Sequence, residues 1–259
     1  MSSQRLILVD GSGYIFRAFY ALPPMSREDG TPVNAVFGFT SMLLKLSEDM
    51  QGENILVVFD AARTTFRNTI YKEYKANRSE PPEELVPQFD LIKEATTAIG
   101  LKSLEVENYE ADDIIATYAK IAKKENIETL IISSDKDLMQ LIQDGVSLHD
   151  PMKNIKIGPE AVLEKFGVTP DKVIDVQALA GDTSDNVPGV PGIGVKTASQ
   201  LINEFGSLEN LLINASSIKQ EKRRESLLNN AELARISKKL VSLFSDVPIP
   251  YKISDLKWK

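Results

Sequence analysis

Leu6-Ile-Leu-Val-Asp10 is a short apolar run that ends in an aspartate, and the chain repeats this pattern twice. The later copies are Leu56-Val-Val-Phe-Asp60 and Leu130-Ile-Ile-Ser-Ser-Asp135. Short runs rich in Val, Ile and Leu predict buried strands. Longer stretches with apolar residues at helical spacing lie between them, as at 35–50 and 111–123. The alternation predicts an α/β fold with a mostly parallel central sheet flanked by helices.

The strand signals stop near residue 175, which divides the chain into two expected parts. We expect residues 1–175 to form the α/β domain and residues 176–245 to form a helical unit. The helical segments of this unit are expected at 196–204, 208–212, 219–229 and 233–244. Residues 246–259 contain two prolines and are typical of a tail or linker.

The composition excludes several classes of protein. The chain has 259 residues and no cysteine, which rules out disulfides, thiolate zinc sites and a cysteine nucleophile. Lack of cysteine also suits a reducing compartment, so we expect a cytoplasmic protein. The apolar run at 6–9 is too short for a signal peptide, and no stretch is long and apolar enough to span a membrane. We expect a monomer without a membrane partner.

Aspartates end or follow all three predicted strands, at Asp10, Asp60 and Asp135. One such aspartate can simply form a turn or cap a helix. Three such aspartates are expected to lie close together, because the carboxyl ends of parallel strands share one edge of the sheet, where ligands usually bind. The pattern therefore indicates a common acidic site.

A second acidic group, Glu110-Ala-Asp112-Asp113, opens the predicted helix at 111–123. The helix dipole accounts for one or two acids in a first turn. Three in four residues repel one another and raise one another's pKa unless a cation compensates. This group therefore favours a metal site.

Two further acid pairs lie in Asp135-Lys-Asp137 and Asp182-Thr-Ser-Asp185. The second pair, taken alone, is equally typical of a turn before Pro188. Oxygen donors with almost no histidine favour Mg²⁺ or Mn²⁺ over zinc, and His149 is expected to be structural. Many carboxylates without a nucleophilic side chain match two-metal phosphoryl chemistry. The nine candidate ligands are Asp10, Asp60, Glu110, Asp112, Asp113, Asp135, Asp137, Asp182 and Asp185.

The net charge of −7 is unusual for a nucleic-acid-binding protein, since phosphate contacts call for a basic surface. The chain has 37 acidic and 30 basic residues, so without the nine candidate ligands the basic residues are in slight excess. We therefore expect the acidity to be concentrated at the site.

Seven motifs, in this order, resemble the flap endonuclease and 5′-3′ exonuclease family, most of all the N-terminal 5′-nuclease domain of bacterial DNA polymerase I. They extend over nearly the whole chain, and no acidic position is lost. The motifs are Val9-Asp10-Gly-Ser12, Phe59-Asp60, Tyr71-Lys-Glu-Tyr-Lys-Ala-Asn-Arg78, Tyr109-Glu110-Ala-Asp-Asp113, Ser134-Asp135-Lys-Asp137, Gly181-Asp182-Thr-Ser-Asp185-Asn186 and Pro191-Gly-Ile-Gly-Val-Lys-Thr-Ala198.

The resemblance implies a PIN-like 5′-nuclease fold with a helix-turn-helix DNA-binding unit. It implies a structure-specific nuclease, both 5′-3′ exonuclease and flap endonuclease, that hydrolyses DNA phosphodiesters in replication and repair, such as primer or flap removal. Two ions, Mg²⁺ or Mn²⁺, are implied. By resemblance, Asp10, Asp60, Glu110, Asp112 and Asp113 would serve mainly the first ion. The second would be served mainly by Asp135, Asp137, Asp182 and Asp185.

Residues 63–85 are expected to form a helical arch. Arg67, Tyr71, Lys75 and Arg78 fall at helical spacing and so predict a basic and aromatic stripe, although an ordinary solvated helix face has the same pattern. By resemblance, the 5′ strand passes through the arch and Lys75 and Arg78 contact the reacting phosphate. Arg67 is assigned to the catalytic group as well. Expected DNA contacts of this segment are Tyr71, Lys72 and Tyr74.

The segment at 189–198 is similar to a helix-turn-helix hairpin of the DNA-repair kind. It follows no predicted strand and lacks the glycine spacing of a dinucleotide-binding turn. Gly192 and Gly194 would let the backbone approach a duplex phosphate, which the amides of the next helix can hold. The family often places K⁺ in this turn. Lys196 and Thr197 complete the expected DNA contacts.

The implied partner is branched or 5′-ended duplex DNA, including RNA-primed DNA. The segment at 246–259 resembles the junction to a following domain, so a covalent polymerase domain is expected in the parent protein. Three alternatives remain. A phosphatase with Asp10 as nucleophile would need a second aspartate where Ser12 stands, and a small ribonuclease would need no helical unit. A non-catalytic DNA-binding scaffold would keep a cluster of carboxylates at electrostatic cost.

Overall fold

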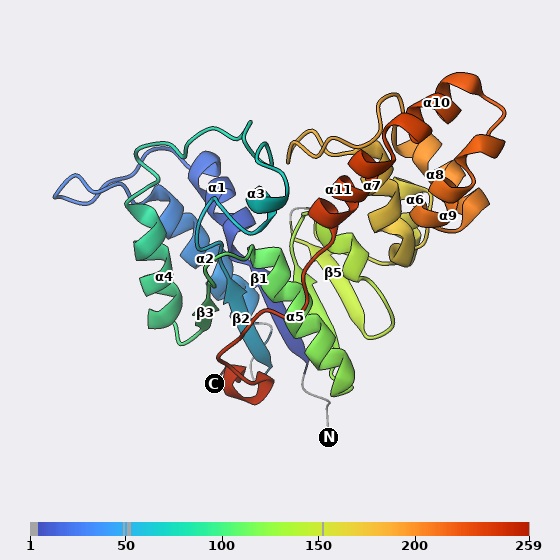
Figure 1. Cartoon of the computed structure of the whole chain (residues 1–259). Helices are drawn as coiled ribbons and strands as arrows, with labels where there is room; N and C mark the ends of the chain where they lie inside the picture. Colours follow the sequence, from blue (N-terminus) through green and yellow to red (C-terminus); the bar gives the residue numbers. More distant parts are fainter. Residues whose placement is uncertain (1–4, 49, 51–52, 152, 259) are drawn as a thin grey trace.

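A six-stranded sheet forms the centre of the molecule, with the strand order β3-β2-β1-β4-β5-β6 (Figure 1). The computed structural model describes residues 5–48, 50, 53–151 and 153–258. All neighbouring strands are parallel except β5 and β6, so the predicted mostly parallel sheet is confirmed. The strands are β1 (Leu6–Asp10), β2 (Asn54–Val58), β3 (Lys102–Leu104), β4 (Thr129–Ile132), β5 (Val146–Asp150) and β6 (Ile155–Ile157).

Helices cover both faces of the sheet (Figure 1). One face carries α1 (Gly11–Ala21), α2 (Asn34–Glu48) and α4 (Gln88–Ala98), and the other carries α5 (Ala111–Lys124). The expected helix at 35–50 corresponds to α2, and its Asp49 lies outside the described residues. The remaining α-helices are α3 (Arg67–Ile70), α6 (Pro159–Phe166), α7 (Val173–Ala180), α8 (Val195–Phe205), α9 (Leu208–Ile213), α10 (Glu221–Asn229) and α11 (Ala231–Val241).

Strand β1 shows why the apolar runs form the middle of the sheet. All five of its residues are buried. Leu6 and Leu8 pack on the α5 side, whereas Ile7 and Val9 pack on the side of α1 and α2. Successive side chains of a strand point to opposite faces, so a strand covered on both faces must be apolar throughout.

The connectivity places the acidic strand ends at one edge. The chain runs from β1 to β2 and β3, and then returns to β4 on the other side of β1. Strand order reverses between β1 and β4, and crevices at such reversals bind ligands in open α/β sheets. Asp10 ends β1, while Asp60 and Asp135 follow β2 and β4 within three residues. All three therefore lie around this crevice.

The helical unit packs directly on the α/β domain. Leu201, Leu208 and Leu227 belong to the same buried cluster as Leu6 and Leu8. The part of the chain after β6 contains helices and no named strand among its described residues, as the sequence predicts. The boundary expected at residue 175 falls inside α7.

The segment after α11, expected to be a tail or linker, packs on the α/β domain along α5 (Figure 1). Val247, Ile253 and Leu256 are buried in the α5-side core, and Lys257 forms a bridge with Asn54 of β2. The prolines of this segment disfavour a helix but allow an extended chain to bury apolar side chains. The segment is therefore a packed part of the fold and not the predicted tail or linker.

The predicted helical arch at 63–85 is also different in the structure. Only α3 is helical in this segment, and residues 72–77 form turns in which Lys75 has a φ of 56°. The predicted stripe of four residues at helical spacing is therefore wrong. Arg67 is held in the core, and Lys75 and Arg78 are held by ion pairs. These tertiary contacts override the weak local preference for a helix.

No helix in the described part of the chain combines the length and apolar character that crossing a membrane requires.

Candidate active site and metal centre

Asp10 is the central acid of the site. It follows Val9 at the end of the middle strand, is only 6% exposed, and accepts a hydrogen bond from the Gly13 amide at 3.0 Å as the N-cap of α1. The Ser133 hydroxyl donates to its other oxygen at 2.7 Å. These two contacts hold the carboxylate at the edge of the sheet between β1 and β4.

Asp60 and Asp112 approach this edge from β2 and α5. Asp60 accepts a hydrogen bond from the Ala111 amide at 2.8 Å, while its own amide donates to the Ser12 hydroxyl at 2.9 Å. The first contact ties the end of β2 to the first turn of α5, which carries Asp112. The helix N-terminus is thereby positioned beside the strand ends.

Four carboxylates repel one another at this edge, and we call Asp10, Asp60, Asp112 and Asp135 the acid quartet. Burial raises the pKa of Asp10 to about 6, and repulsion from Asp135 and Asp60 adds to the rise. Burial likewise raises the pKa of Asp112 well above its usual range, with further contributions from its three quartet neighbours. The quartet is therefore a focus of negative charge.

No lysine or arginine in the described ranges forms an ion pair with a member of the acid quartet. Nor do any three acidic or histidine side chains there already adopt a geometry that would hold one ion. The fit to metal therefore rests on donor chemistry and charge. All donors are carboxylate oxygens, which Mg²⁺ and Mn²⁺ prefer, and a divalent cation would remove the repulsion.

We predict that Asp10→Asn stabilises the metal-free protein at high pH. The native pKa of about 6 exceeds the usual 3.8, so the stability that the protonated group contributes is lost as the pH rises between these values. Asn remains neutral, so the gain in unfolding free energy should grow by roughly 2 kcal/mol between pH 4 and pH 8. Denaturant unfolding in EDTA measures it.

The matched control for this prediction is Asp144→Asn, because Asp144 is exposed in the turn before β5. Its effect on unfolding should be small, because the side chain is exposed. If Asp10→Asn and Asp144→Asn gave the same pH dependence, the electrostatic account of the quartet would be wrong.

A second acidic group faces the quartet. Burial and the neighbouring Asp135 raise the pKa of Asp137 to about 7. A hydrogen bond from the Gln177 side chain, at 2.6 Å, lowers this pKa but does not cancel the rise. Burial alone would raise the pKa of Asp182, but an ion pair with Lys136 lowers it. Asp185 completes the group, which thus carries partly compensated charge.

The turn that carries Asp182 and Asp185 depends on two glycines. Gly181 and Gly189 have φ values of 71° and 62°, in the left-handed region. A Cβ atom on Gly189 would lie 2.4 Å from the Gly181 nitrogen, so the two backbones are in direct contact. Only glycine fits here, and the close approach holds the turn over the site.

Two cations from the 63–85 segment form ion pairs with acids of the site. The Lys75 ammonium is 2.7 Å from Glu110 and 3.6 Å from Asp185, and Arg78 also pairs with Asp185. Burial would lower the pKa of Lys75, but Glu110 and Asp185 raise it, so this side chain stays charged. The predicted catalytic cations Lys75 and Arg78 are therefore brought to the acids.

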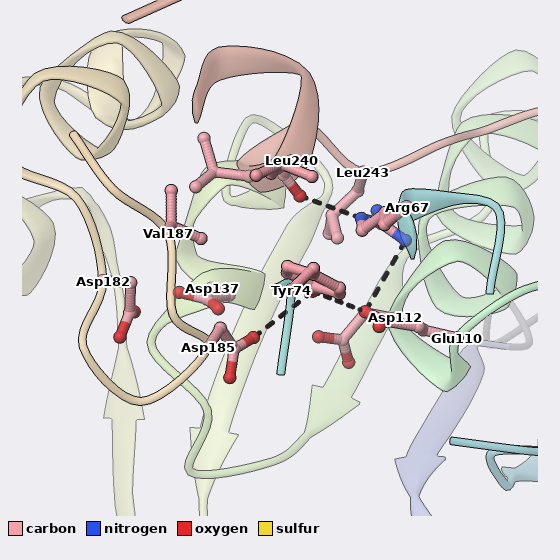
Figure 2. A pocket seen from close by; sticks show the side chains of 11 residues that line it. Arg67, Tyr74, Glu110, Asp112, Asp137, Asp182, Asp185, Val187, Leu240 and Leu243 are labelled. Carbon is pink, nitrogen blue, oxygen red and sulfur yellow. Dashed lines mark hydrogen bonds and ion pairs between the residues drawn. The ribbon is translucent and has the colours of Figure 1, made fainter. Parts of the chain in front are cut away.

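Tyr74 lies between the acidic groups rather than on the surface. Figure 2 shows its ring between Glu110 and Asp112 on one side and Asp137 and Asp185 on the other. The side chain is 4% exposed, with its hydroxyl 3.2 Å from Glu110 and 3.4 Å from Asp185. The prediction that Tyr74 contacts DNA is contradicted, because burial leaves no surface for a base. Tyr71 is half-buried and Lys72 exposed.

Arg67 and Asp113 are paired with each other. Both side chains are fully buried, and two parallel hydrogen bonds of 2.7 Å join the guanidinium to the carboxylate. Asp113 was expected to bind metal and Arg67 to act on the phosphate. The structure corrects both assignments, because each buried charge is neutralised by the other and neither side chain reaches solvent.

The turn before α8 presents the expected DNA contacts to solvent. Gly192, Gly194 and Lys196 are exposed and Thr197 is half-buried. Gly194 is the N-cap of α8, and no side chain from the described part of the chain caps the helix there. The first amides of α8 are therefore directed to a surface where an anion can bind.

Several residues of the site were not among the sequence-predicted ones. Ser133 and Ser12 hold Asp10 and Asp60, Gln177 holds Asp137, and Lys136 pairs with Asp182. Lys136 lies between two predicted ligands, which was a usable signal. Ser12 stands in the first family motif, whereas nothing in the sequence distinguishes Ser133 and Gln177 from other serines and glutamines.

Two family models together match residues 5–259. Residues 5–167 match the 5′-3′ exonuclease N-terminal resolvase-like domain, and residues 168–259 match the 5′-3′ exonuclease C-terminal SAM fold. The chain belongs to the 5′-3′ exonuclease family. The resemblance stated from the seven motifs is confirmed, as is the PIN-like fold with its helical unit.

Curated relatives of this family member are bacterial DNA polymerases I. The chain is 53% identical to that of Rhizobium leguminosarum over 259 residues, 97% of this chain and 26% of the relative. It is 43% identical to that of Bacillus subtilis over 260 residues, 99% of this chain and 30% of the relative. The chain thus spans about a quarter to a third of the length of these relatives.

Solved structures of the T5 5′-exonuclease share the fold. One, with bound zinc ions, has 25% identity and a TM-score of 0.78, covering 93% of this chain and 90% of that one. A T5 flap endonuclease in a pseudo-enzyme-product complex with DNA and metal ions has 25% identity and a TM-score of 0.77, with the same coverage.

Proposed function

We propose that this 5′-3′ exonuclease family member is a structure-specific 5′ nuclease that hydrolyses DNA phosphodiester bonds both as an exonuclease and as a flap endonuclease. The observation that carries the proposal is the acid quartet, four carboxylates without a cationic partner among the described residues, at the crevice of a parallel sheet. The similar T5 flap endonuclease, solved with DNA and metal ions, supports it. Replication and repair, such as primer or flap removal, are the corresponding roles.

Two Mg²⁺ or Mn²⁺ ions are the proposed cofactors. Asp10, Asp60, Glu110 and Asp112 would hold the first ion, and Asp135, Asp137, Asp182 and Asp185 the second. Zinc ions bound to the T5 5′-exonuclease, which has the same fold, support a dependence on divalent cations. When bound, such ions activate the attacking water and stabilise the leaving oxygen.

The chain's own cations would act on the reacting phosphate. Lys75 lies within ion-pair distance of Glu110 and Asp185, and Arg78 pairs with Asp185. A phosphate entering between these groups would meet both cations, which can neutralise the charge that develops on its oxygens in the transition state. Products are expected to carry a 5′-phosphate and a 3′-hydroxyl.

The helical unit would hold the duplex. The exposed amides at the start of α8, together with Gly192, Gly194 and Lys196, suit a backbone phosphate, and K⁺ is the proposed cation of this turn. Thr197, Tyr71 and Lys72 are the other proposed DNA contacts. Such contacts position a duplex without reading bases, so specificity would come from the shape of the junction.

The proposed substrate is branched or 5′-ended duplex DNA, with RNA primers included. A covalent polymerase domain in the parent protein is also part of the proposal. It is supported by relatives that are DNA polymerases I, of which the chain spans only part.

Cleavage of a labelled 5′-flap duplex tests the proposed function. With Mg²⁺ the protein should release the flap and then shorten the nicked 5′ end, whereas EDTA should abolish both products because the carboxylates alone offer no electrophile. A single strand of the flap sequence is the matched substrate control and should be cut far more slowly. Equal product with Mg²⁺ and with EDTA would disprove the metal-dependent mechanism.

A further inference from the structure

We propose that Arg67 and Asp113 form a buried clasp that positions the first turn of α5, and with it Glu110 and Asp112, against the end of α11. Neither residue would touch the ions or the DNA. Both would be positioning residues for the acids that do. This inference rests on the proposed metal role of Glu110 and Asp112.

The guanidinium of Arg67 connects α3 to two other parts of the chain, α5 and the end of α11. It donates two hydrogen bonds of 2.7 Å to Asp113 in α5. It also donates to the Leu240 carbonyl in α11 at 2.8 Å and to the Ser242 carbonyl, just after that helix, at 3.0 Å (Figure 2 shows the Leu240 contact). The end of α11 leaves these carbonyls without helical partners, so Arg67 caps it.

The carboxylate of Asp113 is fully used by protein donors. One oxygen accepts from Arg67 and from the Phe244 amide at 2.8 Å, and the other accepts from Arg67 and from the Glu110 amide at 3.1 Å. Four donors saturate the group, so no lone pair remains directed at an ion. This geometry separates Asp113 from its neighbour Asp112, although both belong to one acidic motif.

The clasp contacts Glu110 from two directions. Asp113 accepts from its backbone amide, in the capping box at the start of α5, and Arg67 lies 3.6 Å from its carboxylate. The backbone of the α5 first turn is thereby fixed relative to the helical unit. Because Asp112 lies between Glu110 and Asp113, its direction follows from theirs.

The energetics of buried ion pairs point to a positioning role. Well-packed apolar residues of similar size often stabilise a fold as much as a buried pair does, so stability alone does not explain this one. The clasp makes six hydrogen bonds to defined atoms on α5 and at the end of α11. These bonds fix the orientation of α5 relative to α11, which an apolar pair could not do. Residues that orient metal ligands typically change metal affinity about 10- to 100-fold when removed.

A double-mutant cycle with Mn²⁺ binding as the readout tests the clasp. Mn²⁺ affinity is measured by electron paramagnetic resonance titration of the wild type, Arg67→Met, Asp113→Asn and the double variant. Each single variant should weaken binding about 10-fold or more, and the double variant should be no weaker than the weaker single one. Arg27→Met and Asp144→Asn, both at exposed positions, are the controls and should bind as the wild type does.

The double variant keeps the test decisive if Arg67→Met fails to fold, because it contains no unpaired buried charge. Thermal unfolding in the same buffer verifies that it is native. Wild-type Mn²⁺ affinity in the folded double variant would overturn the clasp. So would a loss in Asp113→Asn with no loss in folded Arg67→Met, which would make Asp113 a ligand.

Failure of the proposed function has a different signature. Asp112→Asn is included for this purpose, since it removes a proposed ligand without touching the clasp. If the wild type bound no Mn²⁺, or if Asp112→Asn bound it unchanged, the proposed metal site would be wrong and the clasp would have nothing to position. If Asp112→Asn lost binding while the clasp variants kept it, only the clasp would be wrong.

Discussion

Asp112→Asn is expected to slow cleavage of a 5′-flap duplex by about 10³-fold or more, because it removes a charged ligand from a site where metal supplies the chemistry. Burial and the three other members of the acid quartet raise the pKa of Asp112, so the charged carboxylate destabilises the metal-free native protein. The neutral amide should therefore leave the metal-free fold as stable as before, or more so. Single-turnover rates in Mg²⁺ measure the loss.

Two accompanying measurements make the Asp112→Asn result specific. Affinity for flap DNA in EDTA should not fall, because without bound ions removing a negative charge weakens no phosphate contact. Asp144→Asn, at an exposed position far along the chain, should cleave at the wild-type rate. Cleavage by Asp112→Asn within a few fold of the wild type would exclude this carboxylate from the reaction.

Lys75→Met is expected to lower the single-turnover cleavage rate by about 10²- to 10³-fold, the range typical for loss of one preorganised group that stabilises transition-state charge. Lys75 stays charged between Glu110 and Asp185, at 2.7 and 3.6 Å from their oxygens. Methionine fills similar space without the charge. Substrate affinity should change much less than the rate, because the cation acts where charge develops.

The control for Lys75→Met is Lys124→Met, which removes an exposed lysine at the C-terminal end of α5, away from the site. It should leave both rate and affinity unchanged. If Lys75→Met weakened DNA binding in proportion to the rate, the side chain would serve substrate binding only, and the transition-state role would be rejected.

The acid quartet was largely predictable because its members follow local rules. Buried parallel strands need continuous apolar runs, and an acid at the end of such a run must lie at the carboxyl edge of the sheet. Asp10, Asp60 and Asp135 satisfy this rule, and the first turn of a helix accounts for Asp112. The family motifs then specified the chemistry.

The 63–85 segment was not predictable from periodicity. Arg67, Lys75 and Arg78 have helical spacing, yet Lys75 adopts a left-handed conformation and Arg67 is buried. Local propensity is worth tenths of a kcal/mol per residue, whereas charged hydrogen bonds to buried acids are worth about 1.5–3 kcal/mol each. Contacts distant in sequence therefore decided this conformation.

By itself, the sequence determined the alternation of its three main apolar strands with helices, the gathering of strand-end acids, and membership of the 5′-3′ exonuclease family. These depend on patterns within one segment or on motifs in a fixed order. Only the tertiary structure decided that Asp113 pairs with Arg67 while Asp112 belongs to the acid quartet, and that the segment after α11 packs along α5. The reason is physical: adjacent carboxylates are chemically identical in sequence, and only the partners that folding brings to each one make it a ligand or a clasp.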